Sequence, residues 1–415
     1  MTFDPLKYLQ FLIAPCSQVV RGFVSIYVVN QYLGLTAVGI WAQVLACHAF
    51  MYMFINFNLT QSMSRFYPQY LKNSVNVYRV SSAVFLVNLA FILIYLLILF
   101  PVKDSILDFV YGSDALVGFL LLGFLFAVEN LYNVIYCHYR SILNAKKQAF
   151  LALSRLSFEI IFFLLFVPFF SDQKSLDIYS FLLFYIIFVF VSIFVFIVIM
   201  RESKNIVISG LVVVDNWGQF LNYGLRLLPM SLAFWVISQA DRWIITGKFD
   251  HETLGYYFIA TRFFIIYSLL VSPFHSIYTY IASSHEHNLI GFYKVIRTAT
   301  FVSLLFSLIL YICHPFILFL FNMESEAYIS VSNLVPYMLI SGFLYAFYSI
   351  LNTFRSINAP GLVSIEWVAL SVLYLIFVLI LPSYFGLRGF VFAQILSYMI
   401  VIISVLVRLK FNESI

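Results

Sequence analysis

Apolar segments of about 20 residues recur along this chain from one end to the other, and they constrain its fold more than any other feature. About 20 consecutive apolar residues carry an α-helix across the hydrocarbon core of a bilayer. The pattern predicts twelve spanning helices, at residues 8–30, 38–59, 79–101, 115–138, 149–170, 177–200, 224–246, 254–281, 295–314, 333–353, 362–382 and 386–407. Only 10% of the 415 residues are charged, against about 25% in soluble domains. The sequence therefore predicts an all-α integral membrane protein.

The first apolar segment could be a signal peptide, but it continues beyond Cys16, and Pro15-Cys16 is a poor processing site. We therefore expect a retained first helix. The four cysteines show no CxxC spacing, which argues against a disulfide framework and a cysteine-based zinc site. The longest non-apolar stretch, about 201–223, is too short for a soluble domain.

Basic residues are distributed unevenly over the loops between these spans. With a cytoplasmic N-terminus, the cytoplasmic loops carry sixteen Lys and Arg residues, the outer loops four and the spans three, which accounts for all 23. The outer loops are also acidic, as Asp108, Asp250 and Glu324 illustrate. The positive-inside rule therefore places both termini in the cytoplasm. The sixteen cytoplasmic residues are Lys7, Arg65, Lys72, Arg79, Arg140, Lys146, Lys147, Arg155, Arg201, Lys204, Arg226, Lys294, Arg297, Arg355, Arg408 and Lys410.

The second half of the chain repeats the first. "YRSILNA" at 139–145 matches "FRSINA" at 354–359, and "AVGIW" at 37–41 matches "TLGYY" at 253–257. Arg140 and Arg355 are 215 positions apart, as are Tyr78 and Tyr293, and Gly39 and Gly255 are 216 apart. Because six is even, two halves of six helices each enter the membrane with the same orientation. We expect lobes at 1–208 and 209–415, related by a pseudo-two-fold axis along the membrane normal and enclosing a central cavity, as in alternating-access transporters.

Ionisable residues inside the predicted spans are the best candidates for function, because each is costly in the membrane unless it is paired or hydrated. The candidates for a gate or for ion coupling are Glu129, Glu159, Asp241, Arg242 and Glu366. For Arg242 a snorkelling role at the interface is an equal alternative. For Glu366, close to the cytoplasmic surface, a simple ion pair with a loop arginine is favoured.

Arg21 and Arg262 lie deep within helices of different halves and could converge on one cationic cavity. Arginine binds phosphate through two parallel hydrogen bonds and does not lose its charge. A cavity lined by these two residues would therefore bind an anionic substrate. The alternative is structural, with each arginine tied to Glu129 or Glu159 on another helix.

Sequence motifs of soluble enzymes are absent. The chain has no GxGxxG, Walker P-loop, GxSxG or HExxH motif, and "HEH" at 285–287 is weak metal geometry. We therefore expect no cofactor, no metal and no ATP hydrolysis within the chain. Transport would depend on an ion gradient or on the gradient of the substrate itself.

The stretch "LRLLPMSLAFWVISQADRWIITGKFDHETLGYYFIATRF", from Leu225 to Phe263, resembles the seventh-to-eighth helix region of the Wzx-type polysaccharide flippases. The shared pattern is a glycine and a proline at the helix entry (Gly224, Pro229), the Asp241-Arg242 pair, and a Leu-Gly-x-Tyr run that begins at Leu254. "LTQSMSRFYPQY" at 59–70 resembles the Arg-Tyr/Phe-x-Pro end of their second helix. These flippases belong to the superfamily that includes multidrug extruders and the lipid II flippase.

The resemblance implies a flippase that moves an undecaprenyl-diphosphate-linked oligosaccharide, an O-antigen (lipopolysaccharide) or capsule repeat unit, to the outer leaflet of the bacterial plasma membrane. The diphosphate would be the anion held in the cationic cavity, and the Asp241-Arg242 pair would fix an outer gate. The implied partners are membrane lipids, the polysaccharide polymerase and the chain-length regulator, with no nucleic acid.

Three alternatives stay open on the residues alone. A multidrug exporter of the same fold would need acids and aromatics, rather than arginines, in its cavity. Another envelope-lipid flippase would differ only in cargo. A membrane-embedded O-antigen polymerase or glycosyltransferase would need a large outer loop, and no predicted outer loop exceeds about twenty residues.

Overall fold

The computed structural model describes residues 5–72, 76–103, 115–166, 178–201, 204–208, 217–269, 271, 289–321, 325–358 and 360–411, and every regular element among them is a helix. The first half contains α1 (Pro5–Asn56), α2 (Leu59–Lys72), α3 (Val77–Leu99), η1 (Phe100–Val102), α5 (Ala115–Ser141), α6 (Ala145–Ile161), the π-helix η2 (Phe162–Phe166), α8 (Ile178–Ile199) and α9 (Lys204–Ile208). The second half contains α10 (Trp217–Lys248), α11 (His251–Ile265), α13 (Leu289–Leu320), α14 (Ser325–Ser332), α15 (Val335–Asn358), α16 (Pro360–Ile380), α17 (Pro382–Phe385) and α18 (Leu387–Phe411).

Nine helices in the described part of the chain are long and apolar enough to cross a membrane. One of them, Leu12–Asn56, contains the first two predicted spans, because α1 is interrupted at Gly34, whose backbone (φ 84°, ψ 174°) is not helical. The predicted spans at 149–170, 177–200 and 254–281 extend beyond the described residues. The outer-loop residues Asp108 and Glu324 and the histidines at 285 and 287 lie outside the described residues. A multi-pass helical membrane protein is confirmed, and the number twelve stays a prediction.

The sequence predicts a loop between the spans 38–59 and 79–101, but part of this segment is helical. Phe57 and Asn58 adopt positive φ angles (45° and 56°) and turn the chain into α2, a polar helix of 14 residues. The motif "SRFYPQY" lies on this helix rather than at a helix end. Polar residues surround the apolar face of α2, so the segment was too hydrophilic to resemble a membrane span.

The repeated motif "YRSILNA" corresponds to the turn between two helices. Arg140 lies in the last turn of α5, Leu143 takes a positive φ of 52°, and Asn144 caps α6 by accepting a hydrogen bond from the Lys147 amide at 3.2 Å. Asparagine is a preferred N-cap because its side chain satisfies an amide that has no partner within the helix. The matching motif in the second half similarly ends α15 before α16 begins at Pro360.

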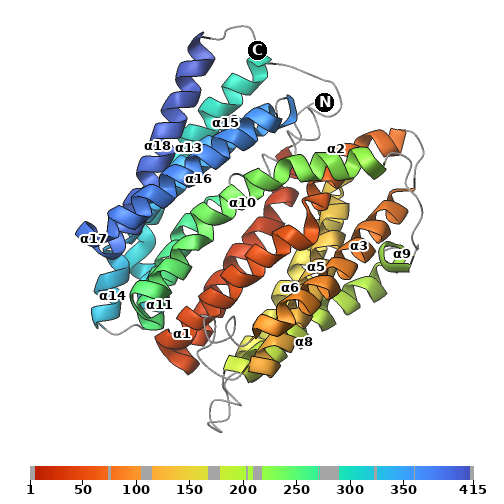
Figure 1. The fold of residues 1–415 in the computed structure, drawn as a ribbon, viewed down its shortest axis with the longest axis horizontal. Coiled ribbons are helices and arrows are strands. Elements are labelled where there is room, and N and C mark those ends of the chain that lie inside the picture. The colour runs from red at the N-terminus through yellow and green to blue at the C-terminus, as the bar shows by residue number, and fades with distance from the viewer. Residues whose placement is uncertain are drawn as a thin grey trace.

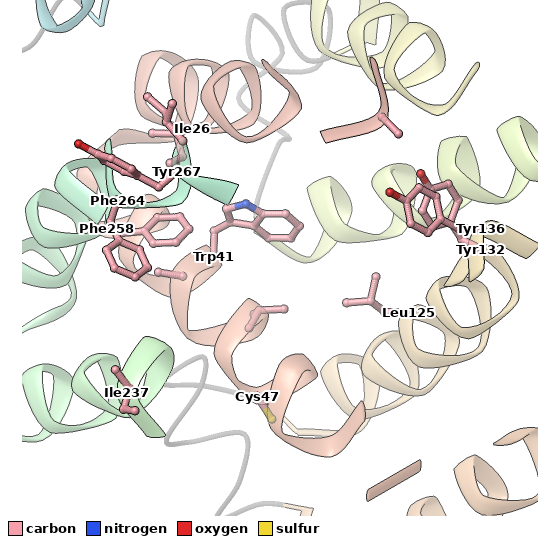
Figure 2. Close-up of a cluster of buried hydrophobic side chains, with 14 of the residues drawn as sticks. Ile26, Trp41, Cys47, Leu125, Tyr132, Tyr136, Ile237, Phe258, Phe264 and Tyr267 are labelled. Carbon is pink, nitrogen blue, oxygen red and sulfur yellow. The ribbon is translucent and has the colours of Figure 1, made fainter. Parts of the chain in front are cut away.

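The helices of each half pack mainly against one another. In Figure 1, α3, α5, α6 and α8 lie together on one side and α13, α15, α16 and α18 on the other, with α1 and α10 side by side between them. Contacts between the halves are made chiefly by α1 with α10 and α11, and by α2 with α10. Figure 2 shows part of the apolar core at this junction, with Trp41 from α1, Ile237 from α10 and Phe258 from α11.

Two glycines at repeat-equivalent positions bring α1 and α11 into backbone contact. A Cβ atom built on Gly39 would lie 1.8 Å from the carbonyl oxygen of His251, and one built on Gly255 would lie 2.5 Å from the carbonyl oxygen of Leu35. Gly39 and Gly255 are 216 positions apart, and so are Leu35 and His251. The contact is therefore reciprocal, as it is in any interface formed around a two-fold axis.

Large apolar side chains cover the outside of several helices, most clearly on α13. Phe301, Leu308, Ile312, Phe316 and Phe319 are all more than half exposed. Polar side chains such as Asn88, Asn130 and Ser341 are instead fully buried. This distribution suits a lipid environment, in which polar groups must find partners within the protein.

Candidate functional site

Arg155 of α6 is the centre of a buried charge cluster in the first half. Its side chain is 2% exposed and donates to Glu159 at 2.8 Å, to Glu129 Oε2 at 2.8 Å and to the Tyr185 hydroxyl at 3.0 Å. A further guanidinium nitrogen, Nη2, contacts Glu129 Oε1. The guanidinium also lies over the Tyr132 ring, with its carbon 4.4 Å from the ring centroid. The cluster joins α5, α6 and α8 through one cation.

Counting Arg155 among the cytoplasmic loop charges is therefore wrong, whereas the predicted span at 149–170, which contains it, agrees with its position on α6. Its side chain lies inside the helix bundle because α6 begins at Ala145, and Arg155 is already about three turns into that helix. The spacing of Arg155 and Glu159, four residues apart on one helix face, is the signal that could have found the pair.

Arg21 on α1 joins this cluster at its edge. Its Nη1 lies 3.5 Å from Glu159 Oε1, and its side chain is 25% exposed whereas Glu159 is fully buried. Arg21 is therefore within ion-pair distance of Glu159, as the structural alternative predicts. Glu159 is shared with Arg155, so Arg21 is only partly neutralised by it.

Arg262 on α11 is different, because in the described part of the chain no carboxylate pairs with it. It is 9% exposed, its Nε has no hydrogen-bond partner among the described residues, and its guanidinium carbon lies 4.1 Å from the centroid of the Phe258 ring. Its Nη1 is 3.0 Å from the position of a Cβ on Gly22, the residue after Arg21. The structural alternative for Arg262 is thus not seen among these residues, and the two arginines come from different halves to the same region.

Asp241 and Arg242 on α10 are both buried, but their side chains have separate partners. Asp241 accepts a hydrogen bond from the Tyr257 hydroxyl at 2.5 Å and another from the Arg242 backbone amide at 2.9 Å. Arg242 Nη1 donates to the carbonyl oxygen of Ala42 on α1 at 3.2 Å, and its guanidinium carbon lies 4.6 Å from the Phe258 centroid. Asp241 therefore ties α10 to α11 within one half, and Arg242 ties α10 to the other half.

Glu366 has the structural partner that was favoured for it. Arg355 donates two hydrogen bonds to its carboxylate, at 2.7 and 2.8 Å, and Arg408 lies 3.7 Å away. These contacts join α15, α16 and α18. A carboxylate held by a two-pronged arginine contact suits a tie between helices better than a moving gate.

A cavity of about 460 Å³ lies between the two halves. Its walls come from α1, α2 and α5 of the first half and from α10, α15 and α16 of the second. The lining residues are Ala49, Tyr52, Met53, Asn56, Asn58, Thr60, Gln61, Arg140, Met230, Ser231, Phe234, Trp235, Ser238, Gln239, Ser268, Val271, Tyr345, Ser349, Asn352, Val363 and Trp367.

Neither Arg21 nor Arg262 lines this cavity, whose one basic lining residue is Arg140 and which has no acidic lining residue among those described. The arginines lie beyond one end of it. On α10, Arg242 follows the lining residue Ser238 by one turn, about 6 Å along the helix axis, and the Phe258 ring contacts the guanidinium groups of both Arg242 and Arg262. A largely apolar cavity with one charged lining residue among those described therefore ends near a cluster of three arginines.

Three features of this region were missed by the sequence interpretation. Arg155 was counted as a loop charge, Tyr257 was noted only as part of a motif, and Gln239 drew no attention. Tyr257 and Gln239 are functional candidates only because helix packing places them beside Asp241 and the cavity.

Comparison with known proteins gives the fold but not the family. No family model matches the chain, and no curated protein sequence matches it. Among solved structures, it is similar to a lipid II flippase MurJ in an inward closed conformation, with a TM-score of 0.68 and 16% identity over 97% of this chain and 87% of that one. It is also similar to the MATE multidrug transporter DinF-BH, with a TM-score of 0.71 and 13% identity over 95% and 93%. A third similar structure is a MOP-superfamily transporter from Pyrococcus furiosus, with a TM-score of 0.64 and 13% identity over 98% and 96%. The chain has the fold of the MOP-superfamily transporters and flippases.

Proposed function

We propose that the chain is a flippase for an undecaprenyl-diphosphate-linked oligosaccharide, an O-antigen or capsule repeat unit. It would carry this lipid from the inner to the outer leaflet of the bacterial plasma membrane by alternating access between two lobes, with both termini in the cytoplasm. Coupling to an ion gradient is part of the proposal, because the sequence contains no nucleotide-binding motif.

The observation that carries this proposal is the uncompensated charge of Arg262. A buried cation without a carboxylate partner is costly in a membrane. The positive charges of Arg21 and Arg242 add to this cost, because they repel the guanidinium group of Arg262. A bound anion would remove this cost. A diphosphate is a suitable anion because its oxygens accept the paired donors of a guanidinium.

The cavity supports a lipid-linked substrate over a cationic drug. A cationic drug would require a carboxylate in the wall, and none of the described lining residues is acidic. The fold is shared by multidrug transporters and by a lipid II flippase, so the fold alone does not choose between them. The arginines and the largely neutral lining favour a lipid diphosphate.

The test is transport by the purified protein in proteoliposomes that contain undecaprenyl-diphosphate-linked oligosaccharide. Arg262→Ala should abolish its movement across the bilayer without lowering protein yield, because none of the described acidic residues pairs with Arg262. Arg262→Lys should retain only part of it, because an ammonium keeps the charge but loses the two-pronged geometry. Arg388→Ala, which removes an exposed arginine at the start of α18, is the matched control. Normal lipid transport by Arg262→Ala would contradict the proposal, and so would export of drugs in place of the lipid.

A genetic test addresses the cargo directly. Deletion of the gene should leave lipid-linked repeat units on the cytoplasmic face and abolish surface polysaccharide. Normal surface polysaccharide together with increased drug sensitivity would favour the multidrug exporter, provided that no second flippase substitutes.

A further inference from the structure

The cavity between the halves has a single charged lining residue, Arg140, among those described. Amide and hydroxyl side chains line it from both halves, among them Asn56, Asn58 and Gln61 from the first half and Ser238, Gln239 and Asn352 from the second. These groups both donate and accept hydrogen bonds but carry no charge. Apolar side chains form the larger part of the lining, so a matching ligand would present neutral polar groups together with an apolar face.

One wall of the cavity is aromatic. Phe234 of α10 lies near Tyr345 of α15, at a centroid distance of 5.8 Å, and Trp367 of α16, at 5.7 Å. All three rings line the cavity, and Phe234 is 38% exposed. Aromatic rings offer a flat, rigid apolar surface. A sugar ring has a matching surface, because its C–H groups lie on one face while its hydroxyl groups point outward.

Two side-chain amide atoms on the lining residues have no hydrogen bond. Gln239 Oε1 on α10 and Asn352 Nδ2 on α15 are buried and unpartnered within the described part of the protein. A buried polar group without a partner costs about 1–3 kcal/mol. One is an acceptor and the other a donor, and a sugar hydroxyl can satisfy either.

We infer that this cavity recognises an uncharged sugar of the lipid-linked cargo. Phe234, Tyr345 and Trp367 provide the stacking surface, while Gln239 and Asn352 bond to the hydroxyl groups. The volume of about 460 Å³ fits a small saccharide. This inference rests on the proposed function and adds to it the chemical class of the glycan: apart from Arg140, the described lining residues are uncharged, so most of the wall offers no group to balance the charge of a charged sugar.

Three probes test the inference on the purified full-length protein, with tryptophan fluorescence as the readout, because Trp235 and Trp367 line the cavity. The probes are undecaprenyl diphosphate, the same lipid carrying a neutral trisaccharide of hexose and N-acetylhexosamine, and the same lipid carrying a trisaccharide that ends in a uronic acid. The neutral glycolipid should bind about ten times more tightly than the bare lipid, which corresponds to about 1.4 kcal/mol. The uronic acid should lose most of this gain.

Two substitutions test whether Gln239 and Asn352 bind the sugar. Gln239→Leu and Asn352→Leu should each lower affinity for the neutral glycolipid several-fold and leave affinity for the bare lipid unchanged. A purely structural role would change both affinities and the melting temperature together. The control is Ser192→Ala, which removes a buried hydroxyl on α8 that donates within its own helix, to the carbonyl oxygen of Val189 at 2.7 Å.

The outcomes separate this inference from the proposed function. Equal binding of the bare and the neutral lipid would overturn sugar recognition while leaving the lipid flippase intact. Tighter binding of the uronic acid probe would overturn the choice of an uncharged sugar. Absence of binding by all three lipids would overturn the proposed function itself. Because the three probes are compared on the unaltered protein, this test does not depend on whether a variant folds.

Discussion

The two halves of the chain share a repeated scaffold but have different interiors. In the first half, Glu129, Arg155 and Glu159 form a buried ionic cluster. The residues found 215 positions later are apolar or neutral, namely Leu344, Leu370 and Tyr374. The second half has buried charges on α10 and α11, where Asp241 bonds to Tyr257 and Arg262 lacks a carboxylate partner among the described residues, and on α16, where Glu366 pairs with Arg355.

The comparison shows which features the repeat retains. The backbone contact of Gly39 and Gly255 occurs in both directions, so the packing of one half against the other is symmetric at this point. The charges are not symmetric. The ion-paired cluster joins helices of the first half, whereas Arg262 of the second half has no carboxylate partner among the described residues. We infer that the Glu129–Arg155–Glu159 cluster holds helices of the first half together, and that Arg262 of the second half contributes to the anion site.

The largest expected effect follows from removing the centre of the ionic cluster. Arg155→Ala leaves Glu129 and the fully buried Glu159 without their main partner. Breaking a buried ion pair costs about 3–5 kcal/mol, so the melting temperature and the yield of membrane-inserted protein should fall sharply. Thermal unfolding in detergent, followed by fluorescence, measures the loss.

A variant in which the unpaired acids are also neutralised distinguishes the effect of the lost charge from the effect of the lost side-chain packing. Adding Glu129→Gln and Glu159→Gln to Arg155→Ala should recover much of the stability, because it makes the first half as neutral as the equivalent positions of the second. Arg79→Ala, at an exposed position of the same half, is the control. A single Arg155→Ala variant as stable as the unaltered protein would show that the cluster does not hold this half together.

The positions of the long apolar helices could be predicted from the sequence because hydropathy is a local property, whereas the polar helix α2 was missed. The apolar runs, the break near Gly34 and the repeated "YRSILNA" turn are all encoded within short stretches. The site could be predicted only in part. Arg21 and Arg262 were found because each is an isolated charge in an apolar run, and their convergence was inferred from their positions in different halves.

The partners of these charges could not be predicted, since they depend on which helix faces which. Arg242 bonds to the carbonyl oxygen of Ala42, 200 positions away, and backbone carbonyls carry no signal in the sequence. The cavity lining poses the same difficulty, because its neutral amides come from both halves of the chain and resemble ordinary polar residues. The charge of Arg155 was misplaced because a residue near the end of an apolar run resembles a loop residue.

The reciprocal glycine contact gives the second prediction. Gly39→Ala and Gly255→Ala each introduce a methyl group against a backbone carbonyl of the other half, which cannot move aside as a side chain can. Overpacking of this kind costs about 1–3 kcal/mol, and transport should fall in both variants. Similar losses of stability at the two sites would support the two-fold relation. The control is Gly218→Ala, where a Cβ meets no atom within 4 Å. A large loss at one glycine and none at the other would contradict the symmetry.

The third prediction concerns Asp241 and Arg242, which the sequence suggested as a mutually neutralising gate pair. Because their side chains have different partners, exchanging the two residues should be no better tolerated than a single alanine substitution. Tyr257→Phe removes one donor to the Asp241 carboxylate and should cost about 1.5–3 kcal/mol, as for other hydrogen bonds to charged groups. Thermal unfolding and transport measure both effects. Full activity of the exchanged variant would instead support the hypothesis that Asp241 and Arg242 form a gate pair.

The smallest expected effect compares two equivalent helix starts. Asp250 lies 216 positions after Gly34, and it caps α11 by accepting a hydrogen bond from the Thr253 amide at 2.6 Å. The bonds from Thr253 lower the pKa of the Asp250 carboxyl below its ordinary value of 3.8. Asp250→Ala should therefore cost about 1 kcal/mol at neutral pH, a typical value for a lost N-cap.

This cap should also be sensitive to acid, whereas the glycine in the other half should not. A carboxyl whose pKa is lowered by folding contributes stability above its unfolded pKa and loses it as the pH falls through the folded value. The difference in melting temperature between the unaltered protein and Asp250→Ala should thus shrink as the pH falls below about 4. Gly34→Ala should be destabilising at every pH, because Gly34 has a backbone conformation that only glycine adopts readily. If the loss of melting temperature caused by Asp250→Ala does not depend on pH, the role of Asp250 is packing rather than capping by its charge. The helix starts at Gly34 and Asp250 would then differ only in backbone conformation.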